Sequence, residues 1–250
     1  MLLNITERPN TWEAVATCQL IQSFDSVAFS DSAHLKELAW LLDAMPAMRR
    51  EDPTAPLHAL QYATAYRAIE YSTEPYIEVL AKTNNIKIAE IRNLELTMDH
   101  APYPQMAELP YGIIACPYGT TAGLNLSHEV WSHIIRLLRT YGLPVYMLGE
   151  KGQRLDAGSF LEDEILSNLT NAEKLRCIQT GSTLIVGAPN AWTWLGAALH
   201  KKMVILQPDV IPTRRWFWQD DPDIMHLVYE SAQIQIPLIL TGIRQLIQKL

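Results

Sequence analysis

Hydrophobic positions in the second half of the chain alternate between short continuous apolar runs and segments with helical spacing. The clearest example spans Thr183–Gln207. An apolar run ending at Gly187 leads through a polar elbow into a helical segment, 191–199, and the apolar run Met203–Leu206 closes the unit. Apolar runs separated by short helices are typical of parallel strands that are buried on both faces. The pattern predicts a strand–helix–strand unit of a parallel sheet.

The same alternation covers the rest of the second half. Ser127 is a good N-cap for a helix over 129–141. A closing helix is expected over 234–250, and it could pack against the N-terminal half. The other predicted elements are strands at 111–116 and 143–148, helices over 160–169 and 171–178, and a loop rich in aromatic and charged residues over 208–223.

The first half has a weaker version of this pattern. We predict strands at 1–6, 26–29, 68–71 and 86–91, helices at 11–24, 57–66 and 75–83, a helix capped by Ser30-Asp31-Ser32 that ends near Pro46, and a loop at 49–56. Two prolines make 99–104 the best linker. The sequence therefore predicts an α/β chain of two Rossmann-like domains, 1–105 and 106–250, with a ligand cleft between them.

Composition limits the class of protein. The 250 residues are 48% hydrophobic and 19% charged, which allows one large domain or two small ones. No apolar run reaches the roughly 18 residues of a membrane-spanning helix, and the N-terminus predicts no secretory signal. The three widely spaced cysteines form no disulfide framework or metal-ligand pattern. We expect a cytoplasmic protein.

The formal net charge of −7 is unevenly placed. Residues 1–109 carry 15 acidic and 8 basic side chains, whereas residues 110–250 carry 12 of each. The second half is therefore the better host for an anionic ligand such as a nucleotide diphosphate. An acidic first half argues against an extended surface for DNA or RNA.

Two loops follow predicted strands, at the edge where open parallel sheets bind ligands. The loop 117–123 carries glycines and hydroxyls that suit close approach to phosphate oxygens, with a helix N-terminus behind it. It matches neither GxxxxGK[ST] nor GxGxxG. The elbow within 187–194 is the second candidate. The alternative for both is an ordinary connection in an α/β core.

Charged and aromatic residues supply further candidates. Arg214 and Arg215 could clamp a diphosphate, and the indole of Trp216 next to them could stack on a base or sugar, or simply pack in the fold. The acidic run at 220–223 could hold a metal, but a solvated loop is the favoured interpretation. Glu13, at the start of the first helix, could deprotonate a hydroxyl nucleophile or simply interact with the helix dipole.

Several of these segments together resemble a known family. The chain is similar to the heptosyltransferase-like glycosyltransferases of family 9, which have the GT-B fold of two Rossmann-like domains facing a central cleft. Residues 186–202, VGAPNAWTWLGAALHKK, align without a gap to the family segment VGNDSGPMHLAAALGKP. The strand and loop at 111–123, the strand at 143–149, and Glu13 at the family's aspartate position extend the resemblance. The N-terminal half looks shortened.

The sequence differs from that of the family at positions where family members bind the donor. Pro189 and Trp194 stand at the positions of an aspartate and a histidine, and Ala191 replaces a glycine. The lysine before the first helix of this half also looks absent, with Asn125 nearby. These losses remove groups that a diphosphate would use. Arg214 and Arg215 could replace the charge, or the site could have decayed.

The resemblance implies sugar transfer from a nucleotide-activated donor to an acceptor hydroxyl, without a metal or other cofactor. The acceptor is expected to be a saccharide, with a modified nucleobase as an alternative, and Glu13 is the candidate catalytic base. A non-catalytic binding or scaffold protein and, less favoured, a sugar-nucleotide epimerase are the alternative functions. The residues expected to contact the donor are Tyr118, Gly119, Thr120, Thr121, Asn125, Glu150, Asn190, Trp194, Arg214 and Arg215.

Overall fold

The computed structural model describes two compact units, the first built from Met1–Pro104 and the second from most of the chain from Gln105 on. The described residues are 2–5, 15–18, 20, 26–29, 40–41, 49–50, 58–60, 62–69, 76–86, 111–119, 125–150, 153, 155, 160, 164–210, 221–231 and 233–249. In this part of the chain no helix is long and apolar enough to cross a membrane.

The first unit contains a parallel sheet of short strands in the order β3-β2-β1-β4. These strands are β1 (Leu2–Ile5), β2 (Ser26–Phe29), β3 (Arg49–Arg50) and β4 (His58–Leu60). Helices α3 (Tyr62–Ile69) and α4 (Tyr76–Thr83) follow β4, and α4 buries one apolar face. Residues 15–18 and 20 are helical and buried, in agreement with the predicted first helix.

Three predictions for this half are wrong. Residues 49–50 form β3 instead of a loop, the helix predicted at 57–66 divides into β4 and α3, and the strand predicted at 68–71 begins inside α3. The reason is tertiary, because β4 pairs with residues 3–5 of β1 and this pairing outweighs local helical preference. The predictions for 30–39, 42–48, 87–91 and the linker 99–104 lie outside the described residues.

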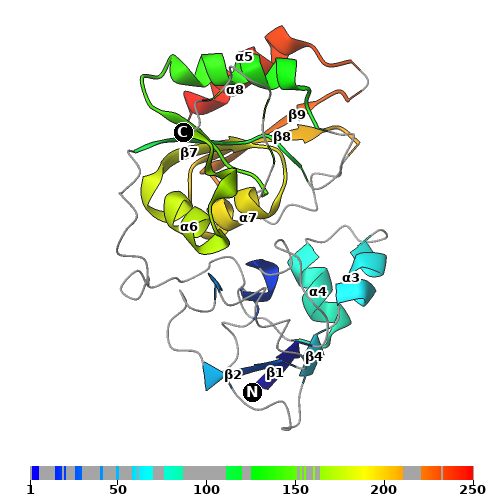
Figure 1. The fold of residues 1–250 in the computed structure, drawn as a ribbon. Coiled ribbons are helices and arrows are strands. Elements are labelled where there is room, and N and C mark those ends of the chain that lie inside the picture. The colour runs from blue at the N-terminus through cyan, green and yellow to red at the C-terminus, as the bar shows by residue number, and fades with distance from the viewer. Residues whose placement is uncertain are drawn as a thin grey trace. The chain divides into compact units, whose positions relative to one another are not determined.

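The second unit has a five-stranded parallel sheet in the order β6-β5-β7-β8-β9 (Figure 1). Its strands are β5 (Gly112–Cys116), β6 (Val145–Met147), β7 (Ser182–Gly187), β8 (Met203–Pro208) and β9 (Ile224–Tyr229). Every residue of β5, β6 and β8 is buried, which explains why these strands are apolar apart from Gln207. This confirms the predicted α/β class and the three-element unit within 183–207.

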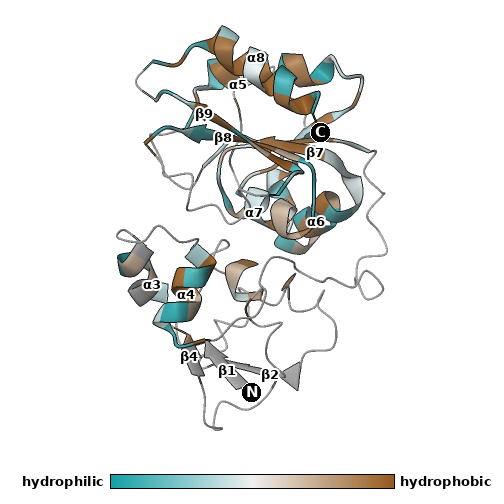
Figure 2. Cartoon of the chain, turned by 180° about the vertical axis from the view of Figure 1, so that it is seen from behind, coloured by the Kyte–Doolittle hydropathy of each residue, from teal (hydrophilic) through white to brown (hydrophobic). Residues whose placement is uncertain are grey.

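Helices cover both faces of this sheet. Helices α5 (His128–Arg139) and α8 (Ile236–Ile247) lie over one face (Figures 1 and 2), and α6 (Asn171–Arg176) and α7 (Ala191–Ala198) lie over the other. Helix α6 continues into a π-helical turn, η3 (Cys177–Gly181). On the α7 side, a Cβ on Gly196 would overlap the side chain of Ile185, so glycine allows the helix backbone to approach β7.

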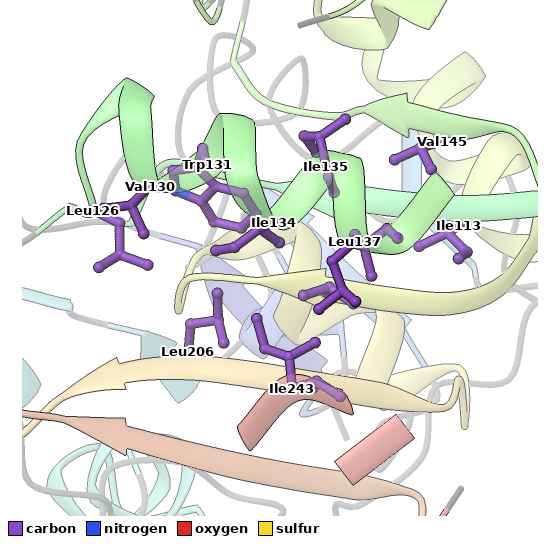
Figure 3. Packing of buried hydrophobic residues seen from close by; sticks show 14 of the residues in the cluster. Ile113, Leu126, Val130, Trp131, Ile134, Ile135, Leu137, Val145, Leu206 and Ile243 are labelled. Atoms are coloured by element: carbon purple, nitrogen blue, oxygen red, sulfur yellow. The ribbon is translucent and has the colours of Figure 1, made fainter. Parts of the chain in front are cut away.

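The main core lies between the sheet and the pair α5 and α8 (Figure 3). Trp131, Ile134 and Leu138 recur at helical spacing on α5 and meet alternate residues of the strands, such as Val186. Burial of each large side chain contributes about 1.5–3 kcal/mol. The core therefore holds the carboxyl ends of the central strands in fixed positions.

Two predictions for the second half are corrected. In the predicted helix 160–169 the described residues instead include a single turn, η2 (Leu166–Asn168), because Ile165 forms a β-bridge with Met147. Strand β9 was not predicted at all. Its residue His226 interrupts the apolar run that marks the other strands, and its pairing with β8 depends on tertiary structure.

Candidate functional site

The strand order of the second sheet reverses at β5. Strand β6 lies on one side of β5 and β7 on the other, and the helices that follow β5 and β7 lie on opposite faces. The loops after these two strands therefore diverge at the carboxyl edge, and open α/β sheets bind ligands at such a switch point. The two loops are those singled out from the sequence.

A side chain within the loop after β5 closes this loop by a hydrogen bond to its backbone. The backbone N–H of Gly119 donates to Oδ1 of Asn125 at 2.6 Å. A Cβ on Gly119 would lie 3.1 Å from that oxygen and 3.4 Å from the carbonyl oxygen of Pro189. The absence of a side chain at position 119 lets the loop after β5 approach the elbow after β7.

Asn190 joins the elbow to the loop. Its Nδ2 donates to the carbonyl oxygen of Tyr118 at 2.7 Å. Its Oδ1 accepts from the N–H groups of Trp192 and Thr193, both at 2.9 Å, and the Asn190 N–H donates to the Thr193 hydroxyl at 2.9 Å. This reciprocal capping box starts α7. Both the oxygen and the nitrogen of the Asn190 side-chain amide therefore form hydrogen bonds within the fold.

Strands β5 and β7 end together in register, with Cys116 opposite Gly187. The Ala188 N–H donates to the Cys116 carbonyl at 2.8 Å. A Cβ on Gly187 would lie 2.6 Å from Cβ of Cys116 and 2.9 Å from Cγ2 of Thr193. Burial raises the pKa of the Cys116 thiol, which opposes formation of a nucleophilic thiolate.

Helix α5 also begins beside the candidate site. Ser127 accepts a hydrogen bond from the N–H of Val130 at 3.4 Å, which confirms its predicted capping role. His128, in the first turn, meets the ring of Tyr118 edge-on, with 6.5 Å between centroids. The N-termini of α5 and α7 add a positive electrostatic potential that favours anions near these loops.

The turn after β6 lies next along the same edge. The N–H of Glu150 donates to Oε1 of Gln153 at 2.7 Å, and the Glu150 side chain is exposed. The carbonyl of Gly149 accepts from Nζ of Lys174 at 2.8 Å. This lysine of α6 was not singled out from the sequence, because Glu173 and Arg176 in the same short helix make it look like an ordinary surface cation.

The structure brings four predicted donor contacts into one network: Tyr118, Gly119, Asn125 and Asn190. Glu150 lies in the turn after the neighbouring strand β6. Trp194 is 0% exposed in the core, so its indole offers no open face for stacking. The remaining predicted site residues, Glu13, Thr120, Thr121, Arg214 and Arg215, lie outside the described residues. Contact of any of these residues with a donor stays a prediction.

No group of three or more His, Cys, Asp or Glu side chains that could hold a metal ion occurs among the described residues. Asp221 and Asp223 of the acidic run belong to this part of the chain. The N–H of Asp223 donates to a carboxylate oxygen of Asp221 at 2.9 Å, so one carboxylate of the run stabilises its own turn.

The fold of the whole chain is similar to that of E. coli heptosyltransferase WaaC with ADP-2-deoxy-2-fluoro heptose. The TM-score is 0.66 at 12% identity, with 100% of this chain and 99% of that chain covered. A glycosyl transferase family 9 protein from Veillonella parvula DSM 2008 gives 0.67 at 8% identity, covering 100% and 97%. E. coli ADP-heptose lps heptosyltransferase II gives 0.58 at 11%, covering 99% and 98%.

These similarities define the class of fold. The chain has the GT-B type α/β fold of the heptosyltransferases, which confirms the structural resemblance inferred from residues 186–202. No family model matches the sequence. No curated protein matches it either. The chain thus shares its fold with the similar solved structures at sequence identities of 8–13%.

Proposed function

We propose that this protein is a glycosyltransferase that moves a sugar from a nucleotide-activated donor to an acceptor hydroxyl. The observation that carries the proposal is the network of Gly119, Asn125 and Asn190 at the switch point of a GT-B type fold. Two helix N-termini begin at these loops and can stabilise a leaving diphosphate without a metal. Several of the similar solved structures are heptosyltransferases, one of them with ADP.

In this proposal the donor phosphates lie at the loops after β5 and β7. The exposed carboxylate of Glu150 accepts hydrogen bonds from hydroxyl groups of the donor. Arg214 and Arg215 supply the positive charge that pairs with the diphosphate, and Thr120 and Thr121 extend the hydroxyl-bearing loop. Glu13 acts as the base that removes the acceptor proton. The acceptor is a saccharide or another hydroxyl compound, and we expect a cytoplasmic location.

A specific observation favours a second candidate, a non-catalytic nucleotide- or glycan-binding protein. Oδ1 of Asn190 is already occupied by two N–H groups of α7, and Trp194 is buried. Trp194 stands where the related family would place a histidine that holds its donor, and Pro189 stands where it would place an aspartate. A protein that kept the scaffold and lost these contacts would bind a ligand without turning it over.

The first experiment measures binding by isothermal titration calorimetry with ADP, UDP and GDP and with their sugar conjugates. We expect one nucleotide to bind in the micromolar to millimolar range. Gly119→Val should abolish that binding, because its side chain would fill the narrow space beside Asn125 and Pro189. Tyr141→Ser, an exposed position in the turn between α5 and β6, is the matched control. If no nucleotide binds at millimolar concentration, the proposal fails.

The second experiment separates transfer from binding alone. The conjugate that binds is incubated with a panel of saccharide acceptors, and release of the nucleotide diphosphate is followed by chromatography. Glu13→Gln should lower turnover far more than donor affinity, and Arg214→Ala should weaken donor affinity. Binding without release of diphosphate under any acceptor would favour the non-catalytic candidate.

A further inference from the structure

Lys174 on α6 is buried to 1% exposure, an unusual place for an ammonium group. Its Nζ donates to the carbonyl of Gly149 at 2.8 Å, in the turn after β6. The same Nζ lies 4.9 Å from the centre of the Trp192 ring, in the first turn of α7. One side chain therefore connects two segments of the carboxyl edge that contains the candidate site.

The charge of Lys174 is poorly compensated. The carbonyl of Gly149 and the face of Trp192 are its partners, and among the described residues Glu150 is the charged group that favours its protonated form. Burial has the larger effect and lowers the pKa of Lys174. An apolar side chain of similar length would fill this space at a lower desolvation cost. Fold stability alone thus gives little reason for a lysine here.

We propose that Lys174 is a positioning residue for the candidate nucleotide site, a role that rests on the proposed function. Its ammonium group fixes the carbonyl of Gly149 and so orients the backbone that carries Glu150. It also places a positive charge against the first turn of α7, where it reinforces the helix dipole that attracts phosphate. The ligand class is a nucleotide diphosphate, alone or within a nucleotide sugar.

Lys201 provides a matched control within the same unit. It is partly buried, and its Nζ also donates to a backbone carbonyl, that of Gln179, at 2.7 Å. Burial likewise lowers the pKa of Lys201. It precedes β8 and therefore belongs to the amino edge of the sheet, opposite the candidate site. Lys201→Met removes the same kind of interaction where no nucleotide is expected.

The test uses the full chain and the nucleotide that the wild-type protein binds, with ADP as the first probe. Lys174→Met should raise the Kd for ADP about tenfold or more, since a charge-assisted hydrogen bond and a favourable charge are both lost. Lys201→Met should leave the Kd unchanged. Melting temperatures of both variants show how far each lysine contributes to folding.

A second measurement follows the ADP affinity of the wild-type protein and of both variants as the pH rises. Between pH 8 and pH 10 the phosphates of ADP are fully ionised, because the second phosphate pKa is about 6. The wild-type affinity should fall as the pH rises, because burial lowers the pKa of Lys174 and the ammonium group loses its proton at a lower pH than an ordinary lysine does, and Lys201→Met should show the same fall. In Lys174→Met the profile should be flat, an effect that a purely structural lysine would not produce.

The outcomes distinguish the two proposals. If the wild-type chain binds ADP, or another diphosphate of the panel, and Lys174→Met binds it equally well, the role of Lys174 is wrong and the proposed function stands. If Lys174→Met does not fold, Lys174→Gln replaces it, since its amide can still donate to the Gly149 carbonyl but carries no charge, and ADP binding equal to that of the wild type then overturns the role. If the wild-type chain binds no nucleotide, both proposals fail.

Discussion

The side-chain amide of Asn190 donates to the backbone carbonyl of Tyr118 at 2.7 Å, across 72 residues of sequence. The same side chain caps α7 through its oxygen. One residue thus sets both the start of a helix and the distance between the loops that follow β5 and β7. The geometry of the candidate site therefore depends on this amide.

Asn190→Ala should therefore destabilise the second unit by about 2 kcal/mol, the sum of a lost N-cap and a lost hydrogen bond. Asn190→Ser keeps an oxygen that can cap α7 but cannot reach Tyr118, so its loss should be about 1 kcal/mol and nucleotide affinity should still fall. Urea denaturation followed by tryptophan fluorescence checks stability, and calorimetry checks affinity. Equal stability of the two variants would contradict the dual role.

Gly187→Ala should be more damaging than most glycine substitutions. The new Cβ would lie 2.6 Å from Cβ of Cys116 and 2.9 Å from the Cys116 carbonyl oxygen, both on a buried neighbouring strand. Overpacking of this kind costs about 1–3 kcal/mol. We expect a lower urea midpoint in tryptophan fluorescence. Gly187→Ala with Cys116→Gly should recover part of the loss, and no recovery would contradict the stated cause.

Asn125→Ala should loosen the loop after β5, because the N–H of Gly119 loses its acceptor at 2.6 Å. Nucleotide affinity should fall by about tenfold, which corresponds to the roughly 1.4 kcal/mol of one hydrogen bond. Asn125→Asp retains the acceptor but adds a negative charge close to the proposed phosphates. Its affinity defect should diminish at high salt, whereas that of Asn125→Ala should not. Calorimetry at two salt concentrations measures this.

His226 on β9 should make stability dependent on pH. Both ring nitrogens are buried without a hydrogen-bond partner among the described residues, and burial lowers the pKa of the imidazole in the folded protein. Below about pH 6.5 the imidazole of His226 binds a proton more readily in the unfolded chain than in the folded chain. Its contribution to the free energy of unfolding is therefore fully present above this pH and is lost as the pH falls.

His226→Leu should accordingly lose less stability than the wild type between pH 7.5 and pH 5.5. The urea midpoints of the two proteins at both pH values provide the measurement. The carboxylates titrate in both proteins, so their effect cancels in the comparison. Equal losses of stability in the wild type and in His226→Leu would contradict this prediction. They would show that His226 is protonated to the same extent in the folded and in the unfolded chain.

The secondary structure predicted from the sequence is most accurate in segments that are uniformly buried. Strands β5 and β8 are apolar, apart from Gln207, because both faces of the sheet are covered, and α5 carries a cap and a single apolar stripe. Strand β4 and the segment at 164–168 were predicted incorrectly, because pairing with β1 and with Met147 decides their conformation. Such pairing leaves no periodic signal in a short segment.

The sequence by itself determined the α/β class, the loops after β5 and β7, and the resemblance to the GT-B glycosyltransferases, since each depends on local pattern or on a contiguous segment. Only the tertiary structure decided what the candidate residues do. It joined Asn190 to Tyr118, buried Trp194 and brought Lys174 against Trp192. These relationships join residues of separate elements, and sheet order and helix packing alone bring those elements together.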